Sequence, residues 1–331
     1  MRTYTLLFSL LVIACTPVSA QKLIAVHHQG IASYHTDINA AYNAAVNGDT
    51  MYLPGGSFNG FDLNKSLTLI GVGYHPDSTS ATGPTILSHL SLGDAADDSY
   101  ITGIFFTSHI GCYGNISGVT LSRCFLNQGI AFFNNVQYSN WIISENWINI
   151  SSAYGASIYL QSGGASNFLI SNNVIKGYCY SFTSSEISNN IFLNPPTLTA
   201  TYSIVKNNVF ISNYANYSNN CQGYNNLNAG VNGGPDAGGN TGANNYLDDV
   251  PLPTVFVNYS TSNTFFQNDF HVINPAYLGN DGTPVGIYGG VFPWKEGGLP
   301  STPHIRAKII NASTNPDGTL HINVVVKAQD N

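Results

Sequence analysis

The acidic run Gly-Asp-Ala-Ala-Asp-Asp places three carboxylates, Asp94, Asp97 and Asp98, within residues 93–98. Calcium takes several carboxylate and carbonyl oxygens as ligands, and this spacing offers several of them. The run is therefore a candidate Ca²⁺ site. The alternative, which is more common for such runs, is a solvated loop. No other cofactor is expected.

Lys176 and Lys206 are the candidate bases for an eliminative reaction. Such a reaction needs a base to take the proton beside a uronate carboxyl, and often Ca²⁺ to neutralise that carboxyl. Charged residues are scarce between positions 101 and 245, where they comprise Arg123, Glu145, Lys176, Glu186, Lys206 and Asp236. This scarcity argues against a lyase. It also argues against a glycoside hydrolase, which needs carboxylates gathered on one face. The alternative role for both lysines is a solvated side chain at a turn.

Aromatic and amide side chains are more abundant than charged ones, with 20 Tyr in the chain. Rings and amides together suit neutral sugars, because the rings stack on the sugar and the amides bond its hydroxyls. Tyr159, Tyr180 and Tyr202 are the candidate substrate-binding residues. The alternative is that such rings belong to the core or stabilise a stack of coils.

These residues lie in a repeated phrase that must position them. Ile-Ser-Asn-Asn-Val-Ile at 170–175 recurs as Ile-Ser-Asn-Asn-Ile-Phe at 187–192 and as Val-Lys-Asn-Asn-Val-Phe at 205–210. Weaker copies begin at positions 101, 121, 143 and 223. The fourth positions, starting at Ile104, are separated by 20, 22, 27, 17, 18 and 18 residues. Coils of this length indicate a parallel β-solenoid.

In a solenoid each position of the phrase becomes a column of stacked side chains. The first column, from Leu121 to Val205, is expected to face inward, and the second, from Ser122 to Lys206, to face solvent. Arg123 and Glu145 share the third column on adjacent coils and are expected to form a surface ion pair. The fourth column is a predicted asparagine ladder, comprising Asn146, Asn173, Asn190, Asn208 and Asn226. We expect this column to take the left-handed bend and its amides to bond along the stack.

The N-terminal segment sharpens this prediction. Residues 37–46 have helical spacing, with Asp37 or Thr36 as the cap. The phrases Gly-Asp-Thr-Met-Tyr-Leu-Pro-Gly-Gly at 48–56 and Lys-Ser-Leu-Thr-Leu-Ile-Gly at 65–71 follow. Over residues 37–290 the chain resembles the right-handed parallel β-helix proteins of the pectate-lyase-like superfamily. The resemblance implies an all-β fold with an N-terminal capping helix, but no single activity, because that superfamily includes lyases, hydrolases, adhesins and inert members.

The two ends of the chain differ from the repeats. Residues 1–20 read as a secretory signal cleaved after Ala20, with a lipoprotein anchored at Cys15 as the alternative. The β-helix is expected over 21–292, with residues 281–290 as its closing coil and 293–303 as a linker. Residues 304–331 predict a β-hairpin, either an end cap or part of a small β-module.

Composition narrows the partners and the location. Only 8% of residues are charged and the net charge is -7, which excludes a coiled coil and gives no clustered Lys/Arg for nucleic acid. No segment after the signal is apolar enough to span a membrane. Cys112, Cys124, Cys179 and Cys221 are expected to be buried thiols, with one disulfide as the alternative. The chain is therefore expected to be secreted or held at the cell surface.

We expect a non-catalytic β-helix protein that binds a polysaccharide or cell-surface glycan, or that acts as a scaffold. The alternatives are a lyase-like carbohydrate-active enzyme and a purely structural or adhesive protein.

Overall fold

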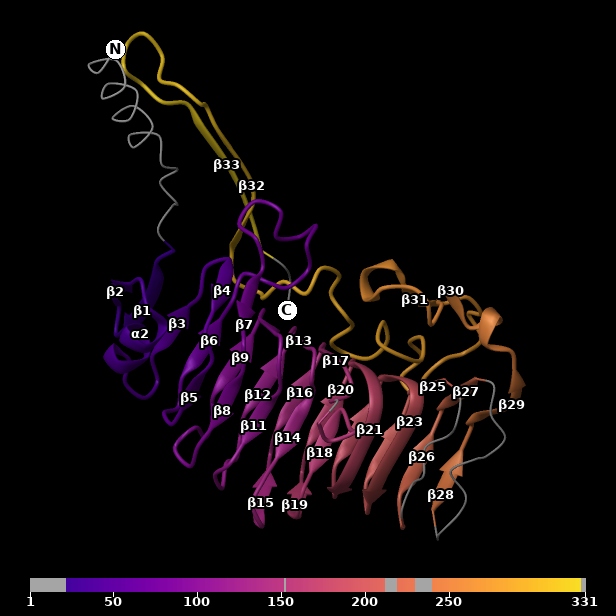
Figure 1. The fold of residues 1–331 in the computed structure, drawn as a ribbon. Coiled ribbons are helices and arrows are strands. Elements are labelled where there is room, and N and C mark those ends of the chain that lie inside the picture. Colours follow the sequence, from indigo (N-terminus) through magenta and orange to yellow (C-terminus); the bar gives the residue numbers. More distant parts are fainter. Residues whose placement is uncertain (1–21, 152, 212–218, 230–239, 329–331) are drawn as a thin grey trace, which may run out of the picture.

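The computed structural model describes residues 22–151, 153–211, 219–229 and 240–328, so the signal and Cys15 lie outside the described residues. The described residues are all-β, with 44% of them in strands and 5% in helices. Successive coils stack with their strands parallel and in register, which makes a parallel β-helix (Figure 1). The predicted fold class is confirmed.

One long sheet carries the first two positions of the repeated phrase. Within the described residues it has 12 strands. In spatial order they are β2 (Ile31–His35), β1 (Ile24–His28), β3 (Thr50–Tyr52), β6 (Thr68–Ile70), β9 (Tyr100–Thr102), β12 (Thr120–Ser122), β16 (Ile142–Ser144), β20 (Leu169–Ser171), β22 (Glu186–Ser188), β24 (Ile204–Lys206), β26 (Gln222–Tyr224) and β28 (Thr241–Ala243). Leu121, Ile143 and Ile170 stand at the same register position and are buried, as the first column predicts.

The remaining coil strands form a second sheet, with 17 strands in the described part of the chain. Its first strands along the chain are β4 (Gly56–Phe58), β5 (Phe61–Leu63), β7 (Thr85–Leu87), β8 (Leu90–Leu92), β10 (Phe105–Phe106), β11 (Ile110–Cys112), β13 (Phe125–Leu126), β14 (Ile130–Phe132) and β15 (Val136–Ser139). The later ones are β17 (Trp147–Ile148), β18 (Ile158–Leu160), β19 (Gly163–Ser166), β21 (Val174–Thr183), β23 (Ile191–Thr201), β25 (Val209–Ile211), β27 (Leu227–Ala229) and β29 (Tyr246–Val250). The main core fills the space that the two sheets enclose.

The N-terminal end is closed by a helix, α2 (Ile38–Ala44), and by the antiparallel pair β1–β2. Asp37 caps the helix by accepting a hydrogen bond from the amide of Ala40 (2.9 Å). Lys65 Nζ donates to the carbonyl oxygens of Tyr42 and Ala45 at the other end (2.8 Å each). The predicted capping helix is confirmed, although it ends two residues earlier than its spacing indicates.

The left-handed bend occupies the third column, not the fourth as predicted. Positive φ angles occur at Gly103, Arg123, Glu145, Asn172, Asn189, Asn207, Asn225 and Asn244. The second column is also less exposed than predicted, because Ser122 and Ser188 are buried.

A segment near the C-terminus runs back along the coils instead of closing them. We call residues 278–300 the return segment (Figure 1). It binds the third column from Asn225, whose amide donates to the Leu278 carbonyl oxygen (2.9 Å), to Arg123, whose Nη1 donates to that of Leu299 (3.3 Å). Between them Asn172 Nδ2 donates to the carbonyl oxygens of Ile287 and Gly289 (2.9 and 2.8 Å). The prediction of a closing coil at 281–290 is therefore wrong.

This path explains why the third-column ion pair is not at the surface. Arg123 Nε lies 2.9 Å from Glu145 Oε2, and the two side chains are 7% and 9% exposed. The shared column was predicted correctly, but the surface position was not, because the return segment covers it.

A second apolar core lies outside the coils. Outward side chains of the second sheet, including Trp147, Val174 and Ile191, pack against Phe270 and Ile287 of the C-terminal region. That region also contains the 3-10 helices η1 (Leu252–Thr254) and η2 (Phe265–Gln267) and the strand pair β30 (Phe256–Asn258) and β31 (Asp269–Val272). Trp294 and Leu299, which lie in the expected linker, are buried.

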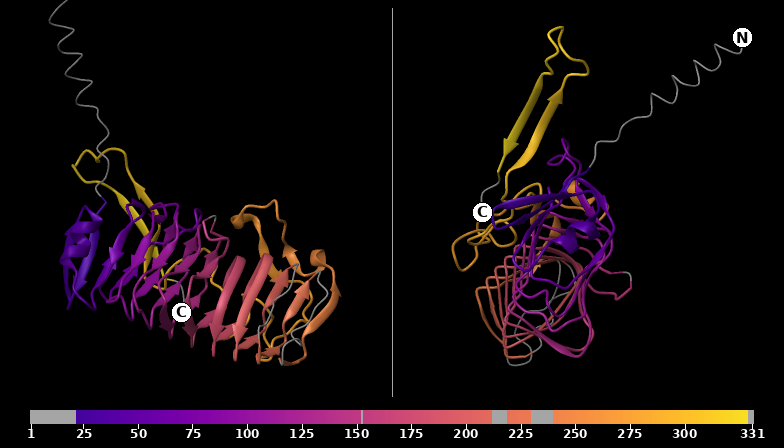
Figure 2. Two further views of the ribbon diagram at one scale, coloured as in Figure 1. Left: turned by 60° about the horizontal axis from the view of Figure 1, so that its bottom comes forward. Right: turned by 90° about the vertical axis from the view of Figure 1, so that its left-hand side faces the viewer.

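The chain then turns into an antiparallel hairpin, β32 (His304–Ile310) and β33 (Ile322–Lys327), as predicted. The hairpin projects from the body of the β-helix and is exposed along both strands (Figure 2). None of the described helices is long and apolar enough to cross a membrane.

Candidate functional site

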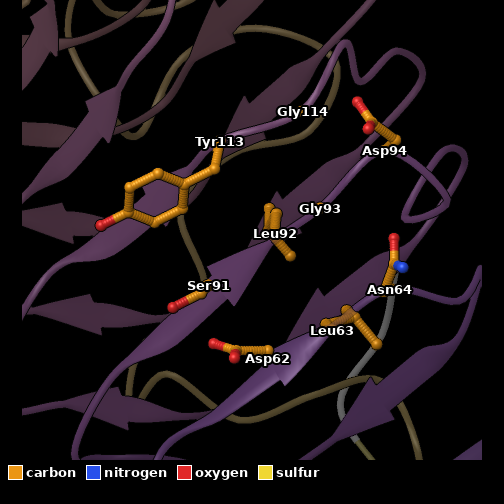
Figure 3. Close-up of a pocket in the computed structure, with 9 residues that line it drawn as sticks. All are labelled: Asp62, Leu63, Asn64, Ser91, Leu92, Gly93, Asp94, Tyr113 and Gly114. Atoms are coloured by element: carbon orange, nitrogen blue, oxygen red, sulfur yellow. The ribbon is translucent and has the colours of Figure 1, made fainter.

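An open groove crosses the outer face of the second sheet near its N-terminal end. It has a volume of about 530 Å³ and is lined by residues of β5 and β8, by the residues that follow these two strands, and by Tyr113 and Gly114, which follow β11 (Ile110–Cys112). Asp62 and Ser91 project from neighbouring strands, and Tyr113 lies beside them (Figure 3). Asp94 and Asn64 lie at the other end of the groove (Figure 3).

Glycines make the groove hollow. Gly93, Tyr113 and Phe133 occupy equivalent positions, directly after β8, β11 and β14. The backbone amide of each donates a hydrogen bond to the carbonyl oxygen of the last strand residue in the preceding coil. The outward column therefore has no side chain between Asn64 and Tyr113. Gly111 allows the Tyr113 ring to lie back over its own strand, since a Cβ there would stand 2.8 Å from the ring.

Tyr113 begins a row of aromatic rings that leads away from the groove. We call Tyr113, Phe133, Tyr154 and Tyr159 the aromatic row. Tyr113 stacks on Phe133 (centroids 4.8 Å apart) and Tyr154 stacks on Tyr159 (5.0 Å). Phe133 meets Tyr154 edge to face at 5.4 Å. Because one face of Tyr113 is packed on Phe133, its other face borders the groove, and the residue is 45% exposed.

The electrostatics of the groove are acidic and polar. Asp62 and Asp94 are both exposed, and none of the lining residues is basic. Asp94 Oδ1 accepts a hydrogen bond from the amide of Asn115 (2.9 Å), which fixes this carboxylate at the rim. Partial burial raises the pKa of Tyr113, so its hydroxyl stays protonated and can donate. The groove therefore offers carboxylate and amide oxygens beside one ring face.

The three aspartates of the predicted calcium site contact residues 115–118 of the next coil. Asp97 Oδ1 accepts from the amide and hydroxyl of Ser117 (2.7 and 3.0 Å), and the Asp98 carboxylate lies against Gly118. In the described part of the chain no group of three His, Cys, Asp or Glu side chains has an arrangement that could hold a metal. Calcium binding by Asp94, Asp97 and Asp98 stays a prediction.

The two candidate bases lie several coils from these aspartates and on different sheets. Lys176 is exposed on β21, four coils beyond Asp94, which is about 19 Å along the axis at the usual strand spacing. Lys206 is on the other sheet and pairs with Glu186 at 3.1 Å. The structure thus brings neither lysine to the aspartates.

The three predicted tyrosines have different surroundings. Tyr159 is in the aromatic row. Tyr180 stacks on Tyr178 with centroids 5.8 Å apart, and Tyr202 is 64% exposed at a bend with positive φ. The sequence interpretation did not single out Asp62 and Tyr113. The alternation in Phe61-Asp62-Leu63 marks Asp62 as outward. The register that sets it beside Ser91 depends on the full length of residues 64–89, which include β6 and β7.

The asparagine column forms a continuous hydrogen-bonded ladder. Each side-chain oxygen accepts from the backbone amide and the side-chain amide of the preceding coil, for example Asn190 Oδ1 from Asn173 (2.9 and 3.0 Å). The same pattern links Asn146, Asn173, Asn190, Asn208, Asn226 and Asn245. All five predicted residues are 1% exposed or less, so this ladder supports the fold and is not open to a ligand.

The four described cysteines are buried free thiols. Burial raises the pKa of Cys124 to about 12, which keeps it protonated and unreactive at neutral pH.

A comparison with models of known protein families finds no match, and comparisons with curated proteins and with solved structures find none either.

Proposed function

We propose that this chain is an exported, non-catalytic β-helix protein that binds neutral glycans in the groove beside Tyr113. The observation that carries the proposal is the free face of the Tyr113 ring, set beside exposed oxygen acceptors. A sugar ring has an apolar C–H face for the aromatic ring and hydroxyl donors for Asp62, Asn64 and Asp94.

The charge of the groove favours neutral over acidic glycans. Asp62 and Asp94 would repel a uronate, and no basic side chain lines the groove to offset them. A kinship with the pectate-lyase-like superfamily fits the stacked coils and the capping helix, and it remains part of this proposal. The export part of the proposal rests on the interpretation of residues 1–20 as a secretory signal.

The test is a titration of the mature protein with neutral hexasaccharides of glucose, mannose, galactose and xylose, by calorimetry, with and without Ca²⁺. We expect Tyr113→Ala to weaken binding by at least about fivefold, because ring stacking on a sugar contributes on the order of 1 kcal/mol or more. Asp62→Asn is expected to weaken it several-fold. Tyr202→Ala is the matched control, since Tyr202 is an exposed tyrosine outside the groove.

Unchanged binding by Tyr113→Ala would reject the groove as the site. The same protein should leave ultraviolet absorbance flat on acidic polysaccharides. Rising ultraviolet absorbance would instead show eliminative cleavage and reject the non-catalytic role.

A further inference from the structure

A second cavity lies under residues 259–268, where the C-terminal region covers the outer face of the second sheet. Its volume is about 380 Å³, within the range of small-molecule sites. Its floor is made by Phe125, Trp147 and Lys176 of successive coils, and its roof by Tyr259 and Phe265. It is separate from the groove, with which it shares no lining residue.

The lining divides into an apolar side and a polar side. Phe125, Tyr259 and Phe265 are half-buried rings, and Trp147 lies beneath them, 4.0 Å from Phe265 between centroids. The polar side has amides and hydroxyls from both the floor and the roof, contributed by Asn149, Ser260, Thr261, Asn263 and Asn268. This combination suits a compact ligand with one apolar face and several hydroxyl groups.

The polar side is held in place by its own hydrogen bonds. Asn268 Oδ1 accepts from the amide of Ser260 (3.2 Å) and from Asn263 Nδ2 (3.1 Å), which fixes the roof. Trp147 Nε1 donates to Asn149 Oδ1 (2.8 Å), which fixes the floor. A pocket formed before the ligand arrives loses less conformational entropy on binding.

Lys176 is the one charged residue in this lining. Its side chain is exposed, and within the residues that the structure describes it forms no ion pair. Lys206 differs, because Glu186 neutralises it at 3.1 Å. The pocket therefore presents a single positive charge beside uncharged groups, which complements one anionic group on a ligand.

We infer that this pocket binds a single sugar ring that carries an anionic substituent, with the ring between the aromatic side chains and the anion on Lys176 Nζ. This inference goes beyond the neutral-glycan groove and is independent of it, because the two sites differ in lining, charge and ligand.

The experiment titrates the full mature chain with D-glucuronate, D-glucose 6-sulfate and D-glucose. Binding is read by calorimetry and by the change in tryptophan fluorescence, to which Trp147 in the pocket contributes. We expect at least one anionic sugar to bind at least about tenfold more tightly than glucose, because a charge-assisted hydrogen bond contributes more than 1.4 kcal/mol. The two anionic sugars separate a carboxylate from a sulfate as the preferred group.

Four variants test the location of the site. Lys176→Gln should remove the preference for the anionic sugar, whereas Lys206→Gln, the matched control, should leave it unchanged. Thr261→Trp places a large ring at an exposed residue of the roof and should abolish binding without disturbing the core. Tyr113→Ala should have no effect here, so failure of this inference and failure of the groove proposal are distinguishable.

The inference is overturned if none of the three sugars binds, if glucose binds as tightly as both anionic sugars, or if Lys176→Gln leaves the preference intact.

Discussion

Asparagine has two different roles at neighbouring positions of each coil. At the third position, in Asn172 and Asn189, it adopts positive φ and binds the return segment. At the fourth, in Asn173 and Asn190, it bonds the coils before and after it. The Asn-Asn pairs alone cannot separate these roles. Gly103 does distinguish them in the sequence. It lies in the third column, and glycine is the residue that most readily adopts positive φ, so it marks the third column as the bend.

Replacing Asn190 with Ala tests the ladder at a single residue. The change leaves the Asn173 amide and the Ile170 carbonyl oxygen buried without their partner. We expect a loss of about 2–4 kcal/mol in the free energy of unfolding, measured by urea denaturation. Asn311→Ala, at an exposed position of the hairpin, should change it by less than about 0.5 kcal/mol. Equal effects of the two substitutions would contradict a structural ladder.

The buried ion pair makes a second prediction at the residue scale. Arg123→Met leaves Glu145 charged and covered, so we expect a loss of about 3–5 kcal/mol in unfolding free energy. The double variant Arg123→Met/Glu145→Leu should lose less than Arg123→Met alone, because no uncompensated charge remains. A double-mutant cycle by urea denaturation measures this, and additive losses would show that the pair is not coupled.

At the scale of elements, sequence periodicity predicted the stacked columns of the repeat but missed the groove, which lies where the outward column is interrupted by a glycine. The first column and the ladder follow a local phrase, so their register could be inferred from spacing. The groove depends on Gly93, which lies where later coils have Tyr113 and Phe133. This equivalence cannot be read from the sequence unless the lengths of the loops between the strands are known. The lining of the groove is therefore a property of the folded coils, not of any segment.

Gly93→Phe fills the gap in the outward column. The backbone at Gly93 does not require glycine, and the nearest atom to an added Cβ is Asn64 Oδ1, on a flexible side chain at 2.9 Å. We expect the new ring to extend the aromatic row, to block neutral-glycan binding, and to change the thermal midpoint by only a few degrees. Retained binding, measured by the same calorimetric titration, would show that the glycan does not occupy the groove.

Asp49 ties the end of α2 to the first strand and makes a pH-dependent contribution. Its Oδ2 accepts from the Val46 amide (2.8 Å), and its Oδ1 lies 2.6 Å from His28 Nδ1. Burial acts to raise the pKa of Asp49, but the hydrogen bonds from Val46 and His28 outweigh it, and the pKa is lowered. The unfolded chain therefore takes up this proton first as the pH falls, so the contribution is present above the unfolded pKa of about 4 and is lost below it.

We expect Asp49→Asn to lower the free energy of unfolding at pH 7 by about 1 kcal/mol, since His28 is half exposed. The difference between the two proteins should shrink as the pH falls from 5 to 3, measured by urea denaturation across that range. A difference that is constant with pH would show that the Asp49 charge is not the cause.

At the scale of the whole molecule, the return segment joins coils that do not touch each other. Solenoids are held by contacts between neighbouring repeats and can unfold in stages. Here one segment binds third-column residues from Asn225 to Arg123 and completes the second core with Val285, Ile287 and Trp294. No repeat or motif predicted this path, because its partners lie far away in the sequence.

A chain ending at Asn274 tests the return segment. We expect a thermal midpoint lower by more than about 10 °C and transitions by circular dichroism and tryptophan fluorescence that no longer coincide. A chain ending at Arg306 lacks most of the exposed hairpin and is the control, with an unchanged midpoint. Coincident transitions and an unchanged midpoint in the shorter chain would show that neighbouring coils alone set the cooperativity.

The return segment also imposes an order on folding. Most coil contacts join residues about 20 positions apart in the repeat, so each coil can form soon after its sequence is available. The bond from Arg123 to Leu299 spans 176 positions, and that from Arg306 to Asp77 spans 229. In a chain made from its N-terminus, the outer apolar face of the second sheet therefore stays uncovered until residues 255–299 arrive. The nascent protein therefore passes through a stage in which the coils have formed but this apolar face is still exposed, and residues 255–299 end that stage by covering it.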